Sequence, residues 1–248
     1  MSTNAFSRTV EYPDCDGLPM SDNTLQFQWI MTIVGGLRAL FRSNPDVFVA
    51  GDLLWYPVEG DNTIRSAPDA MVAFGRPKGY RGSYVQFREG GVAPQVVFEV
   101  RSPGNRASDI ARKYAFYDRF GVEEYYLIDP EGNEVEGWSR VDEALRKIPD
   151  IARWTSPRLG IRFDRSGDEL QMIGPDGRPF ETYEDVAHRA EEERERAEEE
   201  RERAEEERER ADEERGRAEE ERERAEEARI RAERLAEKLR ALGADPDA

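Results

Sequence analysis

Acidic residues stand in two apolar segments of the chain, a pattern typical of sites that bind a divalent cation. Asp69 begins the apolar segment 69–74, and Glu99 lies within the apolar segment 95–101. A carboxylate that points from an apolar strand is costly to bury without a partner, so we expect a cationic group near Glu99. If the two strands are neighbours, the carboxylates repel each other unless a divalent cation lies between them. Oxygen ligands of this kind suit magnesium or manganese.

A third set of polar residues follows the second acid. Asp109, Lys113 and Tyr117 are spaced i, i+4 and i+8, which places them on one stripe of a helix expected over 107–120. This helix is well placed to fold back over the end of the strand that holds Glu99. The stripe would then face the two acids.

The same spacings also have a purely structural interpretation. Asp109 and Lys113 could form an ordinary acid–base pair on a helix surface, worth roughly 0.2–0.5 kcal/mol. Asp69 could simply begin a strand, and Arg101 could be the ion-pair partner of Glu99. Taken alone, the spacings favour this structural interpretation.

A glycine-rich loop over 76–93 could contact nucleic acid. Its cations are interleaved with aromatic residues, and Glu89 is its only acid. Cations for phosphates and rings for stacking are the components of a nucleic-acid contact. A loop that only covers two strands could have the same composition, so both interpretations stay open. The four cations are Arg76, Lys78, Arg81 and Arg88.

The order of the expected elements indicates an α/β domain. A helix is expected over 22–43, capped by Asp22 or Asn23. Gly35 and Gly36 inside this segment weaken the helix prediction or mark close packing. A second helix is expected over 107–120. Strands are expected at 47–58, 69–74, 95–101 and 124–129, and shorter strand-like pieces within 132–180 are expected to extend or cover the sheet.

Charge divides the chain into two parts. Of the formal charge of −17, residues 191–248 carry −10 and residues 1–190 carry −7. An acidic chain lacks the broad positive field of a protein that coats DNA non-specifically, so a nucleic-acid contact would have to be local.

A repeat of seven residues, AEEERER, begins at Ala190 and indicates a helix that runs to Leu242. Pairs such as Glu192–Arg196 would stabilise it. The middle repeats place glutamate where a coiled coil needs an apolar residue, so a solvated spacer helix is favoured over a full-length coiled coil. The closing stretch from Ala225 onward has apolar residues at alternating steps of three and four, and could pair with another copy of the chain.

Other residue types exclude several classes of site. Cys15 is the only cysteine and His188 the only histidine, so a disulfide and a Cys/His zinc cluster are excluded. The four tryptophans, Trp29, Trp55, Trp138 and Trp154, are expected in the core. The chain begins without a signal-peptide pattern and has no apolar run long enough to span a membrane. We expect a cytoplasmic protein with no membrane partner.

Three segments together resemble a known family. APDAMVAFG, VVFEVRSPGN and SDIARKYAFYDRFGVEEYYLIDP are similar to the Uma-two family of restriction-endonuclease-like proteins, within the PD-(D/E)XK nuclease superfamily. The resemblance covers residues 20–180. It implies a restriction-endonuclease-like mixed sheet flanked by helices, and a metal-dependent endonuclease that hydrolyses phosphodiester bonds of DNA. Magnesium or manganese would be the cofactor.

The resemblance also implies roles for individual residues. Asp69 and Glu99 would be the metal-binding acids, with the backbone carbonyl of Val100 as a further ligand. The superfamily lysine should stand two residues after the glutamate, where this chain has Arg101, which stays protonated and cannot act as a base. The lysine role moves to Lys113, which would orient the nucleophile or neutralise charge on the phosphate. Arg101, Asp109 and Tyr117 would be accessory groups.

The sequence therefore predicts three parts. Residues 1–180 are expected to form the endonuclease-like domain, residues 181–243 a long charged helix with a coiled coil near its C-terminal end as an open alternative, and residues 244–248 a disordered tail. A non-catalytic interaction protein with the same fold is the alternative function. Its helix would be a spacer or an oligomerisation arm that contacts a protein partner, and a homodimer is compatible with both functions.

Overall fold

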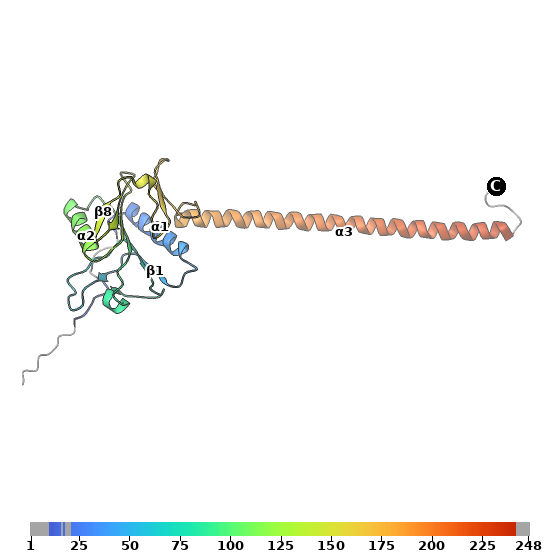
Figure 1. Ribbon diagram of the computed structural model, residues 1–248. Helices are drawn as coiled ribbons and strands as arrows, with labels where there is room; N and C mark the ends of the chain where they lie inside the picture. Colours follow the sequence, from blue (N-terminus) through green and yellow to red (C-terminus); the bar gives the residue numbers. More distant parts are fainter. Residues whose placement is uncertain (1–9, 16, 18–20, 242–248) are drawn as a thin grey trace, which may run out of the picture. The chain divides into compact units, whose positions relative to one another are not determined.

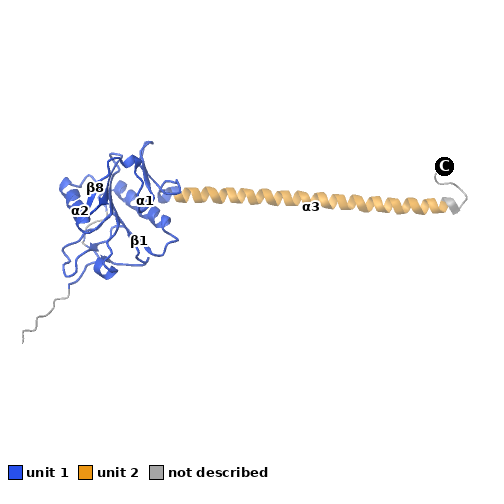
Figure 2. Cartoon of the chain, viewed as in Figure 1, with its two compact units in different colours: residues 1–185 blue, residues 186–248 orange. Residues whose placement is uncertain are grey.

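The computed structural model describes residues 10–15, 17 and 21–241 (Figure 1). Two compact units divide the chain, residues 1–185 and residues 186–248 (Figure 2). The first unit holds a six-stranded sheet and two helices of ordinary length. The second unit holds most of a long helix.

The elements follow the order expected for an α/β chain. The helices are α1 (Thr24–Leu40), α2 (Ala107–Arg119) and α3 (Tyr183–Ala241), with short 3-10 turns η1 (Gln86–Glu89) and η2 (Ile151–Arg153). The strands are β1 (Val47–Ala50), β2 (Trp55–Tyr56), β3 (Ala70–Phe74), β4 (Tyr84–Val85), β5 (Val96–Val100), β6 (Glu124–Asp129), β7 (Glu134–Val141), β8 (Ala144–Lys147), β9 (Arg162–Asp164) and β10 (Gln171–Ile173).

The main sheet is mixed. Its strand order is β1-β3-β5-β6-β7-β8, so β1 and β8 lie at opposite edges. Only β5 and β6 pair in parallel, and the other neighbours are antiparallel. Two parallel neighbours need a crossover connection, which α2 supplies. The mixed sheet with helices and the long C-terminal helix that we predicted are confirmed.

A different helix covers each face of the sheet. Alternate residues of β5 point to opposite faces: Val96, Phe98 and Val100 pack with the apolar side of α1, whereas Val97 packs on the α2 side with Tyr117. The pair β9–β10 adds Phe163, Met172 and neighbouring apolar residues to the α1 side of the core. As expected, the later strands extend the sheet, as β7 and β8, or cover it, as β9 and β10.

One expected strand is interrupted. The prediction of a continuous strand over 47–58 is wrong, because residues 51–54 form a bend between β1 and β2. Asp52 in this bend has φ 45°, a conformation that L-residues seldom adopt. Its backbone N–H donates to the carbonyl oxygens of Pro68 and Asp69, at 3.1 and 3.3 Å. The bend therefore joins the end of β1 to the two residues that precede β3.

Helix α1 begins as the sequence predicted. Asn23 is its N-cap, and its side chain accepts a hydrogen bond from the backbone N–H of Gln26. The two glycines inside the helix have different surroundings. A Cβ at Gly36 would lie 2.2 Å from the ring of Phe180, whereas a Cβ at Gly35 would meet nothing within 4 Å. Close packing therefore explains Gly36 but not Gly35.

Helix α3 has the ion pairs that the repeat predicts. Examples are Glu192–Arg196 and Glu199–Arg203, at 3.9 and 3.5 Å, and most of these side chains are well exposed. His188 is also exposed and lies 3.7 Å from Glu192. Leu242 and the expected disordered tail at 244–248 lie outside the described residues. Among the described helices, none combines the length and apolar character needed to cross a membrane.

The tryptophans and the cysteine lie where the sequence suggested. Trp55 is fully buried, and Trp29, Trp138 and Trp154 are partly buried against the two faces of the core. Cys15 is exposed and forms no disulfide.

The two glycines of α1 provide a matched test of packing. Gly35→Ala should stabilise the first unit by about 0.5–1 kcal/mol, because alanine restricts the unfolded chain and meets no neighbour. Gly36→Ala should destabilise it by about 1–3 kcal/mol, because Phe180 must leave its place against the core. Urea unfolding followed by tryptophan fluorescence measures both. Equal effects of the two substitutions would contradict the packing of Phe180 on α1.

Candidate active site

Asp69 and Glu99 are brought together by the pairing of β3 with β5. Ala70 lies opposite Phe98 in this antiparallel pair, so the next residues outward on the two strands are Asp69 and Glu99. Both are buried, with exposures of 7% and 4%. One oxygen of Asp69 accepts a hydrogen bond of 2.6 Å from the backbone N–H of Val100. Two carboxyl groups therefore share one end of the central strands.

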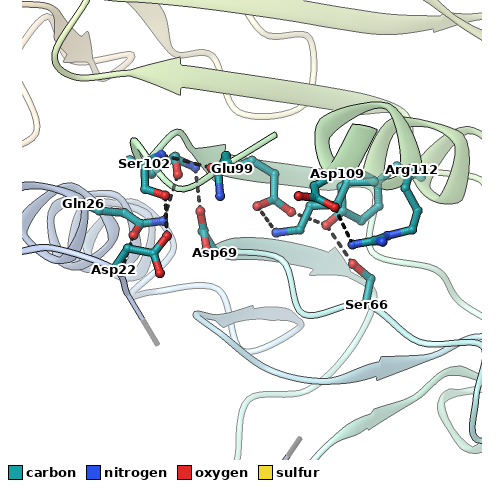
Figure 3. A network of polar contacts seen from close by, with 12 residues as sticks. Asp22, Gln26, Ser66, Asp69, Glu99, Ser102, Asp109 and Arg112 are labelled. Carbon is teal, nitrogen blue, oxygen red and sulfur yellow. Dashed lines mark hydrogen bonds and ion pairs between the residues drawn. The ribbon is translucent and has the colours of Figure 1, made fainter. Parts of the chain in front are cut away.

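Helix α2 provides two partners for Glu99 (Figure 3). The Nζ of Lys113 lies 2.5 Å from Oε2 of Glu99, and the hydroxyl of Tyr117 donates to Oε1. The Tyr117 hydroxyl also lies 3.2 Å from the hydroxyl of Ser66. The cation that the sequence required near Glu99 is thus Lys113, and both oxygens of the carboxylate are hydrogen-bonded.

The pKa values of three groups of the site are raised, for different reasons. Burial raises the pKa of Asp69 well above its ordinary value, and the nearby charge of Glu99 raises it further. Burial by itself would lower the pKa of Lys113, but the charges of Glu99 and Asp69 outweigh burial and raise it. Lys113 therefore stays protonated at neutral pH. Burial, followed by the charge of Glu99, also raises the pKa of Tyr117, which stays neutral and acts as a donor.

On the α1 side of the sheet, side chains form hydrogen bonds with the backbone near the two acids. The amide Nε2 of Gln26 donates to the carbonyl oxygen of Val100 at 2.9 Å, and the backbone N–H of Asp22 donates to Gln26 at 2.8 Å. The hydroxyl of Ser102 donates to the Asp22 carboxylate. Figure 3 shows this chain of contacts running from α1 to the Asp69 side of the site. The backbone N–H and the backbone carbonyl of Val100 therefore both have partners in the protein.

Two of the expected accessory residues lie in other interactions. Arg101 pairs with Asp129 at 2.9 Å rather than with Glu99, and its buried Nε has no hydrogen-bond partner among the described residues. Asp109 pairs with Arg112 at 3.1 Å in the first turn of α2. Of the three accessory candidates, only Tyr117 contacts one of the two acids.

The four cations of the 76–93 loop make contacts within the protein. Arg76 and Lys78 donate to backbone carbonyls, and Arg81 forms a two-point pair with Glu89. Arg88 lies over the rings of Tyr12 and Phe87. The loop also contains β4 and η1, so it is structured. Its cations support the fold, and their contact with nucleic acid stays a prediction.

Sequence reasoning missed three residues of the site. Gln26 carries a recognisable signal, because it shares an apolar helix stripe with Ile30 and Leu37 and a buried amide needs a partner. Ser66 has no such signal. Asp52 stands beside Asp69 through the backbone bend, and its charge helps to raise the pKa of Lys113.

The donor set fits a small divalent cation that prefers oxygen ligands. Two buried carboxyl groups whose repulsion raises a pKa are the groups that such a cation would stabilise. No group of three or more His, Cys, Asp or Glu side chains suited to a metal occurs in the part of the chain that the structure describes. The remaining ligands would be the free lone pair of the Val100 carbonyl, water and substrate oxygens. Magnesium usually keeps several waters in this way.

The model of the Uma2 family, described as putative restriction endonuclease, matches residues 19–165. Among solved structures, the chain is similar to a putative nuclease belonging to DUF820 from Anabaena variabilis ATCC 29413. The identity is 14%, the match covers 54% of this chain and 72% of that chain, and the TM-score is 0.41. No curated protein matches.

The raised pKa of Asp69 predicts how stability depends on pH when no metal is bound. The folded chain holds this proton more tightly than the unfolded chain, whose aspartate titrates near 3.8. The group's stabilising effect is therefore complete below about pH 4 and is lost as the pH rises through the folded pKa. Asp69→Asn removes this loss and can still accept the Val100 hydrogen bond. In EDTA at pH 7.5, D69N should be more stable than the wild type.

The control is Asp46→Asn, which removes one charge at an exposed position. Urea unfolding of the three proteins at pH 4 and pH 7.5 measures the effect. The gain in D69N should shrink toward pH 4. A D69N protein that is less stable than the wild type at pH 7.5 would show that the buried carboxylate is fully compensated.

Proposed function

Because this chain belongs to the Uma2 family of putative restriction endonucleases, we propose that it is a metal-dependent endonuclease that hydrolyses phosphodiester bonds of DNA. Asp69, Glu99 and Lys113 are its catalytic residues. Magnesium or manganese is its cofactor, held by Asp69, Glu99 and the carbonyl of Val100. The observation that carries the proposal is the buried pair of acids with a lysine ion-paired to one of them.

The metal, when bound, would lower the pKa of a water molecule and polarise the phosphate. The chain's own groups hold the two acids in position. The hydrogen bond from Val100 orients Asp69, and Tyr117 orients Glu99. Such fixed polar groups need no rearrangement as charge develops in the reaction.

Lys113 acts as a fixed positive charge. Its raised pKa keeps its proton in place at neutral pH, so it cannot take a proton from water. It would instead donate a hydrogen bond to a phosphate oxygen or to the attacking water, and so neutralise charge that develops in the transition state. The side chain is 34% exposed, so it is open to a substrate.

Lys113→Met should lower the rate of metal-dependent plasmid cleavage by about 100-fold or more, because the charge beside Glu99 is lost. Lys113→Arg should retain part of the activity, because the charge remains. Lys238→Met, at an exposed position on α3, is the matched control and should leave the rate unchanged. Cleavage is followed with magnesium, with manganese and with EDTA.

The roles of the two acids are tested with D69N and E99Q, because each substitution removes the charge and preserves the shape of the side chain. Both should abolish cleavage, and manganese titration by calorimetry should show weaker metal binding in both. Cleavage at the wild-type rate by either variant would contradict the proposed site. An absence of metal-dependent cleavage by the wild type on any DNA form would remove the proposed activity.

The end of α3 supports a second candidate function, assembly with another copy of the chain or with a protein partner. Ile230 and Leu235 are large apolar residues on this charged helix, exposed by 40% and 60%. The long charged stretch before them would be a spacer. An interaction protein would use this end without needing a catalytic site.

Association through the helix end predicts a change of oligomeric state on truncation. The full chain should form a concentration-dependent dimer in analytical ultracentrifugation. A chain ending at Glu181 should remain a monomer over the same concentrations. L235E in the full chain should behave as the truncated chain does, because apolar contacts hold such helix pairs together. Identical states for all three proteins would remove any role of α3 in self-association.

A further inference from the structure

A positively charged cavity lies beside the candidate active site. Its volume is about 550 Å³, and it is lined by the C-terminal part of α1, the edge strand β1 and residues 78–81. Four cations line it: Arg38, Arg42, Lys78 and Arg81. Within the described residues, no acidic side chain lines it. This is a local positive region on a chain whose formal charge is −17.

Two of the four cations are held in place by the fold. Lys78 donates to the carbonyl oxygens of Phe41 and Arg42 at 2.7 and 2.8 Å, at the end of α1 where unpaired carbonyls attract cations. Arg81 pairs with Glu89 and lies 4.0 Å above the ring of Phe48. These contacts shape the cavity wall.

The other two cations have their charge available. Arg38 and Arg42 are exposed, and neither forms an ion pair with any residue that the structure describes. Arg38 lies in the last turn of α1 and Arg42 in the turn that follows the helix, and both line the same cavity. Two guanidinium groups so placed suit an anion with several oxygen atoms, such as a phosphate group, because arginine can donate two hydrogen bonds at once.

The lining of the cavity is linked to the Asp69 side of the acid pair through the backbone. Gly51 and Leu53 line it, and Asp52 between them hydrogen-bonds through its N–H to the carbonyl of Asp69. The cavity follows the edge strand β1 and takes its lining from both sides of the sheet, because Phe48 packs on the side of Tyr117 and Val47 and Val49 pack on the α1 side. A nucleic-acid strand that runs along β1 would therefore reach both the acid pair and the cavity.

We propose that Arg38 and Arg42 bind a backbone phosphate of the nucleic acid that is cut at the neighbouring acid pair. This inference rests on the proposed nuclease function and assigns the place where the substrate strand is held. Tyr80 also lines the cavity and is 95% exposed, so its ring is available to stack on a base. The loop residues Lys78 and Arg81 shape this subsite, and Arg38 and Arg42 provide its free charge.

The test is the salt dependence of DNA binding. Fluorescence anisotropy with a labelled duplex, and with the corresponding single strand, is measured in EDTA over a range of sodium chloride concentrations. Each phosphate contact contributes about 0.9 to the slope of log K against log salt for a duplex, so R38Q/R42Q, which removes one such contact, should reduce that slope by about 0.9. R146Q/R162Q, two exposed arginines on β8 and β9, is the matched control and should keep the wild-type slope.

The outcomes separate this inference from the proposed activity. A wild-type slope in R38Q/R42Q, with normal cleavage by the wild-type protein, would overturn the subsite and leave the nuclease proposal standing. A reduced slope in a protein that binds DNA but never cuts it would support the subsite and remove the catalytic proposal. Equal losses in the two double variants, or no DNA binding by the wild type at low salt, would overturn the subsite. Circular dichroism verifies that each variant is folded.

Discussion

Two carboxyl groups are buried next to each other at the ends of β3 and β5, and the surrounding structure offsets the cost. Burial removes Asp69 and Glu99 from water, and each group also repels the other. Lys113 and Tyr117 compensate Glu99, whereas the N–H of Val100 compensates Asp69 only in part, so the pKa of Asp69 stays raised. Removing any of these partners would leave a buried charge without compensation, which is far more costly than a lost surface ion pair.

This requirement explains the placement of both helices. Helix α2 must cross the sheet directly after β5, because only then do Lys113 and Tyr117 reach Glu99. Helix α1 holds the opposite side, where Gln26 fixes the carbonyl of Val100 while Asp69 binds the N–H of the same residue. One helix orients side chains and the other orients backbone. The site is therefore supported from both faces of the sheet, which suits a catalytic arrangement that must stay rigid.

The charge of the chain is distributed unequally between α3 and the first unit. Much of the negative charge belongs to α3, where glutamates pair with arginines along an exposed helix. The first unit is less acidic, and two exposed arginines, Arg38 and Arg42, lie in the last turn of α1 and directly after it. A strongly acidic total is thus compatible with a local contact to nucleic acid, because the total charge does not determine the charge of a local surface.

The sequence by itself determined the elements whose signals are local. The spacing of apolar residues predicted α1, α2 and the central strands, and the seven-residue repeat predicted α3, because periodic patterns are properties of adjacent residues. The family resemblance and the residue types indicated which acids to examine. The i, i+4 spacing placed Lys113 and Tyr117 on one stripe of α2.

Only the tertiary structure decided which groups meet. Asp109 lies on the same stripe of α2, but in the first turn of the helix, where it forms an ion pair with Arg112. The stripe is longer than the site, so not every residue on it reaches the two acids. The bend at Asp52 depends on carbonyl groups of a distant segment, and no local pattern contains it. Gln26 and Val100 are 74 positions apart, so their hydrogen bond exists only once the sheet and α1 have packed. Contacts between distant segments depend on packing, and packing is a property of the whole fold.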